Sequence, residues 1–466
     1  MSQETYRPSA ACATLPRQGA SMPLNGGMEE VQQHGSEGMR MVVGRKNVTP
    51  PHPLYSRLFV GLAAAITFAI AVPWPDGAQP VPPKLQMRAT APRAFSPNVR
   101  VKLTTTPLAK IELGIDSPCD VRLLGSSRVI GTLEPRKSVQ ARALVGGIRV
   151  GDREFPATRI EIVPRTSPAL WLGEHRYRGS IRLLKQPSGR LVAVNVLPME
   201  DYLASVVNGE TPATFHQAAR RAQAIVARTY ALYQLQQRPA GADFDVYATT
   251  RSQKYLGHQY RDRSGRLLAG ESRASRKLVA DTQGMVCTYR GRIFCTYYSA
   301  VCGDRTTDGR AVFSDAAPPL RSVVCGGCRH ATYYRWKVRI PSATVSKRLA
   351  PLLRKTSRSF GDIQEISRVS TKDAAVASQY VLTDGRRRAT IAGPDLRRAL
   401  STGAQPIYSS NFQANRDGPS WVFEGKGHGH GVGLCQWGAD GLASSGQSCL
   451  EIVRRYYPGC KVVRLR

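Results

Sequence analysis

The segment that decides the fold is residues 197–230, which contains SVVNGETP at Ser205–Pro212 and AQAIVARTY at Ala222–Tyr230. Two apolar patterns with helical spacing flank a turn bounded by glycine and proline, and one acidic residue, Glu210, lies in that turn. A carboxyl group held against apolar helices loses hydration, and this loss raises its pKa toward the neutral range. Glu210 is therefore a candidate proton donor, and the alternative is an ordinary solvated turn residue.

Helix signals extend from this turn in both directions. Before it, Pro198 suits the first position of a helix, where Glu200 and Asp201 complement the positive N-terminus. After it, Thr214-x-x-Gln217 is typical of a capping box, which opens a second helix.

The second helix is predicted to bury one apolar stripe. Gln223 and Arg228 lie away from the centre of this stripe, so their side chains can reach either a site or solvent. The stripe itself consists of Ala218, Ala222, Ile225, Val226, Thr229, Leu232 and Tyr233.

The chain before residue 197 has a different pattern, with short apolar runs that alternate strictly and are separated by turn residues. Examples are VRVKL at Val99–Leu103 and IEIV at Ile160–Val163, and Tyr177–Leu184 with Leu191–Val196 forms a further hairpin. This spacing is typical of antiparallel strands. We therefore predict an α+β fold, with a β-rich N-terminal part followed by a mixed α/β body.

Five regions follow from composition. Residues 1–57 are predicted to be disordered, and residues 58–72 (LFVGLAAAITFAIAV) are an apolar run preceded by basic residues. The run suits a signal peptide or a membrane anchor, so we expect export to the periplasm or cell envelope. Residues 73–97 are a Pro/Ala-rich linker, residues 98–170 the β-rich domain and residues 171–466 the body that carries Glu210.

The chain is strongly basic. Its 66 Lys and Arg residues against 33 Asp and Glu residues give a formal net charge of +33, which attracts anionic polymers and surfaces. Nucleic acid is a weak candidate, because no zinc-finger spacing, RNP-like motif or heptad-bearing basic region accompanies the charge. An anionic cell envelope fits the charge and the predicted export together.

A glycine-rich segment stands near the C-terminus, where four glycines alternate with other residues across positions 427–434. A strand with one face free of side chains can approach another backbone or a sugar ring closely. His428 and His430 would share the opposite face. His430, Gln436 and Trp437 are candidates to shape a binding groove, and packing behind Glu210 is the alternative.

Five motifs together resemble the SpoIID/LytB family, the stage II sporulation protein D group of peptidoglycan-remodelling proteins. They are LPMEDYL at Leu197–Leu203, VVNGETP at Val206–Pro212, AQAIVARTY at Ala222–Tyr230, GHGVGLCQWGA at Gly429–Ala439 and YYPG at Tyr456–Gly459. The resemblance covers roughly residues 96 to 466 and extends to the Gln253-x-Tyr255 word. It implies a SpoIID-like catalytic body that binds glycan strands through Gln223, Arg228, Gln253, Tyr255, His430, Gln436 and Trp437.

The resemblance implies two functions. The first is cleavage of peptidoglycan glycan strands by lytic transglycosylation, in which one carboxyl, Glu210, acts as general acid and then as general base. Hydrolysis usually needs two carboxylates, and Asp243 and Asp245 are the nearby acids that could supply the second. The alternative function is that of a non-catalytic enhancer of a cell-wall amidase, the role given to the LytB branch. No cofactor is expected to be required for catalysis.

Ten cysteines raise the question of a metal or of disulfides. Some family members hold zinc with Cys and His near the Gln-x-Tyr word, but no Cys or His immediately precedes Gln253, so that site is not carried over. Cys325-x-x-Cys328 is a half-site for tetrahedral zinc, with Cys302 as a third ligand and Cys295 or His330 as the fourth. In an exported protein disulfide pairing competes with a structural zinc, and both alternatives stay open.

Overall fold

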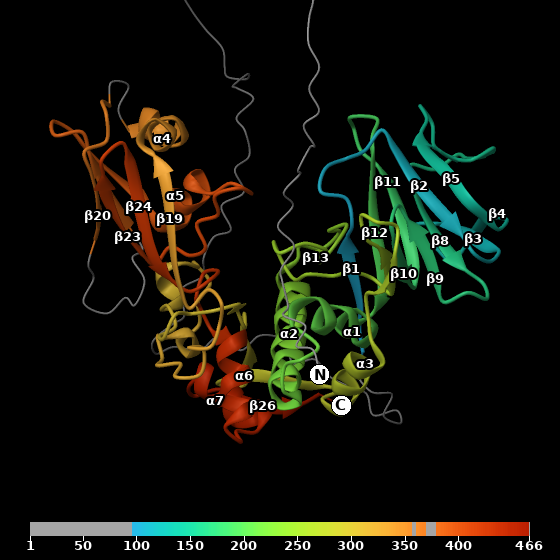
Figure 1. Ribbon diagram of the computed structural model, residues 1–466. Coiled ribbons are helices and arrows are strands. Elements are labelled where there is room, and N and C mark those ends of the chain that lie inside the picture. Colours follow the sequence, from blue (N-terminus) through green and yellow to red (C-terminus); the bar gives the residue numbers. More distant parts are fainter. Residues whose placement is uncertain (1–95, 357–359, 370–378, 466) are drawn as a thin grey trace, which may run out of the picture. The chain divides into compact units, whose positions relative to one another are not determined.

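The computed structural model describes residues 96–356, 360–369 and 379–465 (Figure 1). The predicted disordered segment, the apolar run at residues 58–72 and the linker up to residue 95 lie outside the described residues. Within the described ranges, no helix combines the length and the apolar composition needed to span a bilayer.

Two mostly antiparallel sheets form the β-rich part (Figure 1). The first has the order β13 (Val246–Tyr247), β1 (Asn98–Lys102), β12 (Leu191–Pro198), β11 (Ser180–Lys185), β8 (Arg159–Pro164), β3 (Cys119–Leu123) and β4 (Val129–Leu133). The second has the order β15 (Leu267–Ala269), β14 (Gln259–Arg261), β10 (His175–Arg178), β9 (Ala169–Leu172), β2 (Lys110–Ile115), β5 (Arg136–Ala143), β6 (Ile148–Val150) and β7 (Arg153–Phe155).

Alternation of apolar and polar residues explains how these sheets pack. Val99 and Val101 of β1 are fully buried, and so are the inward residues of β8 and β2 on the two sheets. One continuous apolar core joins the inner faces of both sheets, as in a β-sandwich. The sheets do not stop at residue 170, because β9 to β12 belong to them and β13 to β15 return to them later in the chain. The boundary expected there is therefore no structural break.

Helices dominate the segment that carries Glu210. They are α1 (Met199–Glu210), α2 (Gln217–Gln237), α3 (Arg273–Asp281), α6 (Gln436–Ser444) and α7 (Cys449–Tyr456). α2 is buried along most of its length and contacts the other four helices, because its many alanines allow close approach. The expected capping box at Thr214 is wrong, since α2 begins after His216, whose side chain accepts a hydrogen bond from the Ala218 amide (3.2 Å).

Short sheets complete this region. β16 (Met285–Tyr289) pairs with β17 (Arg292–Ile293) and with β26 (Lys461–Arg464), while β18 (Tyr298–Ser299) runs parallel to β25 (Leu434–Cys435). The parallel pair is the contact that brings the C-terminal glycine-rich segment to the segment after the β16–β17 hairpin.

Residues 335–426 contain a further core of their own, built around Trp421, Tyr380 and Phe412. Its elements are β19 (Arg335–Pro341), α4 (Ser342–Thr356), β20 (Glu365–Arg368), β21 (Gln379–Thr383), β22 (Arg388–Ala392), α5 (Gly393–Leu400), β23 (Phe412–Asp417) and β24 (Ser420–Lys426). The α+β class predicted from sequence is confirmed.

Candidate active site

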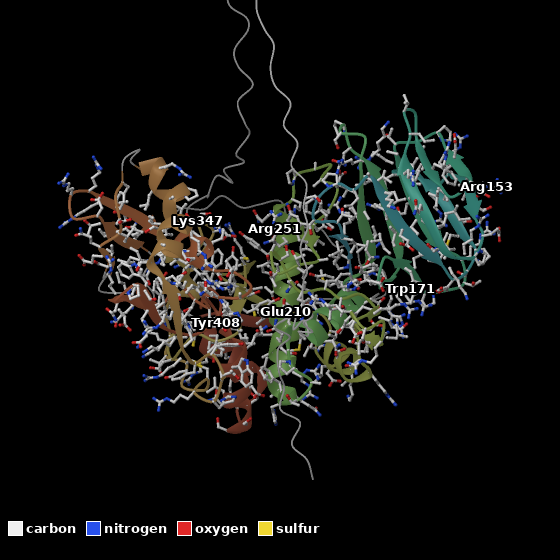
Figure 2. All side chains as sticks on the ribbon, turned by 45° about the horizontal axis from the view of Figure 1, so that its top comes forward. Arg153, Trp171, Glu210, Arg251, Lys347 and Tyr408 are labelled. Carbon is white, nitrogen blue, oxygen red and sulfur yellow. The ribbon has the colours of Figure 1, made fainter. Side chains whose placement is uncertain are left out.

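Glu210 is the last residue of α1, and it is half-buried in the described body (Figure 2). α1 is fixed because Tyr202, Leu203 and Val206 are buried in the core that it shares with the β-sandwich. Gly209 is required next to the acid, since a Cβ there would lie 2.9 Å from the Lys254 carbonyl oxygen. Because Gly209 has no side chain, the Lys254 backbone can approach the end of α1 and the carboxyl group of Glu210.

Three donors contact the two carboxyl oxygens of Glu210. The Lys254 amide donates to Oε1 (2.6 Å), the Tyr298 hydroxyl donates to the same oxygen (3.2 Å), and Gln436 Nε2 donates to Oε2 (3.4 Å). Burial raises the pKa of Glu210 above its ordinary value, and the three hydrogen bonds oppose this rise only in part. The Glu210 carboxyl is therefore protonated more readily than an ordinary glutamate, and hydrogen-bond donors still face its anion.

A chain of hydrogen bonds supports Tyr298 from behind. Gln253 Nε2 donates to the Tyr298 hydroxyl (3.1 Å), and Gln253 Oε1 accepts from the Tyr202 hydroxyl (3.0 Å). Gln253 is fully buried, so this chain fixes the direction in which the Tyr298 hydroxyl points.

The glycine-rich segment forms the facing part of the site, but it is not the regular strand that we predicted. Gly427, Gly429, Gly431 and Gly433 all have positive φ (83°, 102°, 75° and 70°), which interrupts a strand and leaves isolated bridges to neighbouring segments. The expected close backbone approach is present, since a Cβ at Gly433 would lie 1.9 Å from the Tyr297 carbonyl oxygen.

A cleft of about 500 Å³ lies between these parts. His430 and Gln436 line the same cleft as Glu210, as the sequence analysis expected of them. The lining residues are Glu210, Tyr230, Thr250, Arg251, Ser252, Tyr297, Tyr298, Ser299, Ala300, Phe313, Arg397, His428, Gly429, His430 and Gln436. Among these lining residues Glu210 carries the single carboxylate.

His430 is held as a neutral imidazole. Burial and, to a smaller extent, the positive charge of Arg397 lower the pKa of His430 to about 4. Its Nδ1 lies 3.1 Å from the Val432 amide and accepts that hydrogen bond, so the ring proton is assigned to Nε2. The edge-on contact with the Phe313 ring (5.0 Å) fixes the plane of the imidazole.

Two arginines give the cleft a positive charge. The Arg251 guanidinium lies over the Tyr247 ring at 4.0 Å, and Arg397 Nε donates to the Ile407 carbonyl (2.9 Å). Cationic groups of this kind suit a ligand that carries carboxylates.

Five predicted binding residues do not line the cleft, namely Gln223, Arg228, Gln253, Tyr255 and Trp437. Arg228 is 1% exposed and pairs with Glu200 (2.7 Å), which ties α2 to α1. Tyr255 is 3% exposed and donates to Asn195 Oδ1 (2.7 Å).

Gln223 and Trp437 also lie outside the cleft lining. Gln223 is 1% exposed, and its amide atoms have no hydrogen-bond partner among the described residues. The Trp437 ring packs edge-on against Phe215 (5.0 Å) and lies 5.3 Å from the His330 ring. Periodicity alone did not separate Gln223 and Arg228 from cleft positions, because α2 is buried on nearly all sides.

The other acids considered for catalysis lie elsewhere. Asp245 pairs with Arg100 (2.6 Å), and Asp243 pairs with Arg159. Asp315 is not among the residues that line the cleft, and its Oδ1 accepts a hydrogen bond from the Tyr297 hydroxyl (2.7 Å).

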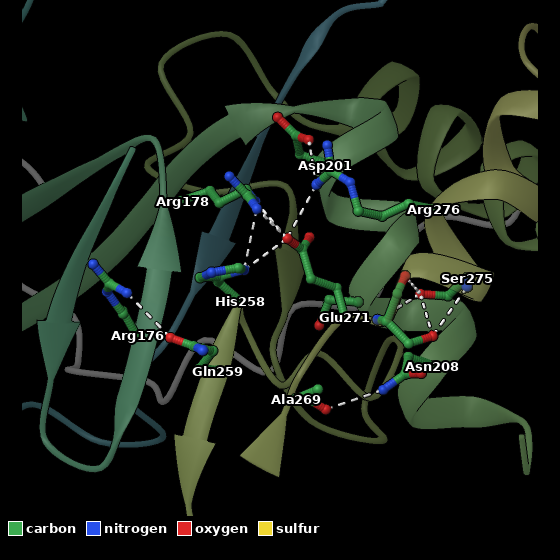
Figure 3. Close-up of polar contacts among 12 residues, drawn as sticks. Arg176, Arg178, Asp201, Asn208, His258, Gln259, Ala269, Glu271, Ser275 and Arg276 are labelled. Carbon is green, nitrogen blue, oxygen red and sulfur yellow. Dashed lines mark hydrogen bonds and ion pairs between the residues drawn. The ribbon is translucent and has the colours of Figure 1, made fainter. Parts of the chain in front are cut away.

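A second polar network braces the start of α1 and the loop after β15 (Figure 3). Its centre is Glu271, which is 7% exposed and contacts Arg178 (2.5 Å), His258 (2.7 Å) and Arg276 (3.0 Å). On the last turns of α1, Asn208 Nδ2 donates to the Ala269 carbonyl (3.1 Å). These contacts hold α1 against the second sheet and so help to position Glu210.

Four buried cysteines could hold a metal. Cys302, Cys325, Cys328 and Cys435 place their sulfur atoms within 4.8 Å of one another. Neither Cys295 nor His330, the fourth ligands considered from sequence, belongs to this cluster: the Cys295 sulfur lies 3.9 Å from Gln234 Nε2, and His330 lies 3.6 Å from Asp440.

Sequence reasoning missed three contributors. The sequence around Tyr298 indicates only a β-strand. Its role at the site depends on the parallel pairing of β18 with β25, which the local sequence does not reveal. Lys254 acts through its backbone amide, so its residue type gives no indication. Cys435 stands inside the GHGVGLCQWGA word, far from the Cys325-x-x-Cys328 pair in sequence, so its spacing gave no sign that the three meet.

The fold and the cleft together define an α+β protein with one protonatable carboxyl group facing a glycine-rich segment. Comparison with known proteins gives the family. The model of the family described as "Stage II sporulation protein" (SpoIID) matches residues 187–289, and the domain of unknown function DUF8618 matches residues 323–433.

Curated relatives extend the match beyond these domains. An uncharacterized protein of Brachyspira hyodysenteriae is 31% identical over 303 residues, which cover 65% of this chain and 76% of that protein. The stage II sporulation protein D of Bacillus subtilis is 25% identical over 58% of this chain and 76% of its own length. The amidase enhancer of B. subtilis is 24% identical over 55% of this chain and 39% of its own length. The chain belongs to the SpoIID/LytB family.

Proposed function

We propose that this protein cleaves peptidoglycan glycan strands by lytic transglycosylation, with Glu210 as the general acid and base. One observation carries the proposal: the cleft lining holds a single carboxyl, and burial raises the pKa of that carboxyl. A two-carboxylate hydrolase would need a second acid in the cleft. Relatives named as a sporulation protein and an amidase enhancer support a cell-wall substrate.

The proposed reaction begins with a proton transfer from Glu210 to the glycosidic oxygen, as the bond from the muramic anomeric carbon to that oxygen breaks. The 6-hydroxyl of the same muramic ring then forms a bond to the anomeric carbon and gives its proton to the Glu210 carboxylate. The product is a 1,6-anhydro ring, no water is consumed, and the carboxyl returns to its starting form.

The surroundings of Glu210 suit both halves of this cycle. The Lys254 amide, Tyr298 and Gln436 are in place to stabilise the carboxylate when it forms. Neutral His430 lies in the cleft lining, where its ring can contact a sugar. Arg251 and Arg397 would meet the lactyl or peptide carboxylates of the substrate.

The location proposed for this activity is the cell envelope. The apolar run at residues 58–72 resembles an export signal, and the net charge of +33 favours an anionic wall. Basic side chains are spread over the surface of the described parts (Figure 2).

The second candidate function is that of a non-catalytic amidase enhancer, favoured by the similarity to the amidase enhancer of B. subtilis. In that case the cleft would bind glycan without cutting it, and a cell-wall amidase would be the partner.

The test is mass spectrometry of purified peptidoglycan after incubation with the full chain. We expect muropeptides with anhydro ends from the wild type, none from Glu210→Gln, and undiminished release from Asp315→Asn, which checks the acid behind Tyr297. Equal release by Glu210→Gln would overturn the assignment. No release by the wild type, with equal stimulation of an amidase by wild type and Glu210→Gln, would support the enhancer instead.

A further inference from the structure

The four clustered cysteines come from three separate parts of the chain. Cys302 follows β18, Cys325 and Cys328 stand in the Cys-Gly-Gly-Cys loop before β19, and Cys435 ends β25 and caps α6. All four side chains are buried, and all four are free thiols in the structure. Four sulfur atoms from distant segments therefore converge on one small volume.

The spacing of the sulfur atoms matches a tetrahedral metal site. A zinc ion lies about 2.3 Å from each thiolate, which sets an edge of about 3.8 Å between sulfurs in a tetrahedron. The Cys302 and Cys328 sulfurs are 3.7 Å apart, and each of the four lies within 4.8 Å of the others. One disulfide would account for only two of these sulfurs, and two separate disulfides would be needed to account for all four.

Backbone and side-chain donors surround the sulfurs. The Cys302 and Gly438 amides both donate to the Cys435 sulfur (3.3 Å each), and the Tyr456 hydroxyl lies 3.0 Å from the Cys325 sulfur. Contacts of this kind orient metal-bound thiolates and stabilise their charge.

The packing around the cluster leaves no room for other side chains. A Cβ at Gly438 would lie 2.3 Å from the Cys325 sulfur, and a Cβ at Gly327 would lie 2.4 Å from the Gly438 carbonyl oxygen. The Cys-Gly-Gly-Cys loop and the start of α6 can meet around the sulfurs only because both residues are glycine.

We propose that Cys302, Cys325, Cys328 and Cys435 bind one zinc ion as a four-thiolate structural site. All four positions of the tetrahedron are filled by protein, so no position is open for substrate or water. Binding releases the thiol protons, so the affinity for zinc falls as the pH is lowered.

The metal would hold together the two segments that complete the cleft. Cys435 precedes Gln436, which donates to Glu210, and Ser299 beside Tyr298 pairs with Cys435 across the parallel β18–β25 ladder. The zinc site therefore acts as a cross-link behind the cleft. This inference is independent of the reaction proposed above, because it concerns metal content and stability.

The test uses the full chain purified without added chelator. Elemental analysis is expected to give one zinc ion per chain, and replacement with cobalt(II) is expected to give the intense visible bands and thiolate charge-transfer bands of a tetrahedral thiolate site. Cys325→Ser and Cys435→Ser should lose the metal, whereas Cys295→Ser, a matched buried cysteine outside the cluster, should keep it.

Several results would overturn the proposal. They are a wild-type chain without bound metal, a disulfide between any two of the four cysteines in a non-reducing peptide map, or loss of zinc from Cys295→Ser with retention in Cys435→Ser. If the cluster variants fail to fold, the metal content and the cobalt(II) spectrum of the wild type still test the proposal. A chain without metal or without the thiolate bands would overturn it.

Discussion

At the scale of residues, Glu210 combines a half-buried position with three hydrogen bonds that stabilise its anion. Burial favours the neutral acid and raises its pKa. Hydrogen bonds from the Lys254 amide, Tyr298 and Gln436 stabilise the carboxylate and lower its pKa. A proton donor that must later become a base needs both properties, because too strong a preference for either form would stop one half of the cycle.

Glu210→Gln is expected to raise the stability of the fold at neutral pH. The folded pKa of Glu210 lies above its unfolded value, so its contribution is fully present below the unfolded pKa of about 4.3 and is lost as the pH rises through the folded pKa. Glutamine avoids this loss while its oxygen still accepts from Lys254. Thermal melts across pH should give a gain at neutral pH that vanishes in acid.

The control for this prediction is Glu424→Gln, which removes an exposed acid paired with Lys337. It should change stability by no more than about 0.5 kcal/mol. A Glu210→Gln variant that is less stable than the wild type at neutral pH would show that the carboxylate is not strained by burial.

Tyr298→Phe is expected to slow glycan cleavage about tenfold, because one hydrogen bond to a charged carboxylate is worth about 1.5 kcal/mol. The Tyr298 hydroxyl lowers the pKa of Glu210, so its loss should raise that pKa and move the alkaline limb of the pH–rate profile to higher pH. Tyr297→Phe is the matched control, since its hydroxyl contacts Asp315 instead. An unmoved alkaline limb in Tyr298→Phe would argue against the contact.

At the scale of elements, α2 links α1 to the rest of the body. Its residues contribute to two apolar cores: Ala224 and Ala227 pack in the core shared with the β-sandwich, and Ile225 and Val226 pack in the core shared with the glycine-rich segment. The cleft is formed where these two cores meet, so the position of α2 determines the distance between Glu210 and its facing residues.

Arg228→Ala is expected to unfold the protein more easily rather than to weaken glycan binding directly. Removing one partner of a buried ion pair costs about 3–5 kcal/mol, and the side chain of Arg228 is 2% exposed beside Glu200. Chemical denaturation measures this loss. Arg251→Ala, on the cleft lining, should leave stability nearly unchanged and reduce glycan binding. If Arg228→Ala instead reduced glycan binding without lowering stability, Arg228 would be a binding residue.

Trp437→Ala is also expected to act through stability. The indole packs on Phe215 and His330 outside the cleft, so its removal should lower the free energy of unfolding by about 1–3 kcal/mol. Glycan affinity of the folded variant should stay close to that of the wild type. A large loss of affinity without a loss of stability would place the indole in the groove, as the sequence had suggested.

Sequence patterns predicted some of these elements well and others poorly, for physical reasons. Strict alternation identified the strands around Val99–Leu103 and Ile160–Val163, because one face of each sheet is buried. Periodicity failed in α2, since a helix buried on all sides has no polar face to distinguish Arg228 from a cleft residue.

At the scale of the whole molecule, the site depends on contacts between distant parts of the chain. Glu210 and Gln436 meet although 226 residues separate them, and the four cysteines converge from three segments. The motifs indicated which residues belong to the family, but local patterns carry no information about such pairings. The motifs therefore pointed to Glu210, His430 and Gln436. Tyr298 and Cys435 join the site and the cluster only through long-range pairings, so they were not predicted.

The most direct test of the central claim is cleavage of peptidoglycan in water labelled with heavy oxygen. An intramolecular attack by the 6-hydroxyl consumes no water, so the new muramic ends should be anhydro rings without the label. Incorporation of one labelled oxygen at each new reducing end would show that water is the nucleophile, and it would contradict the account given for Glu210.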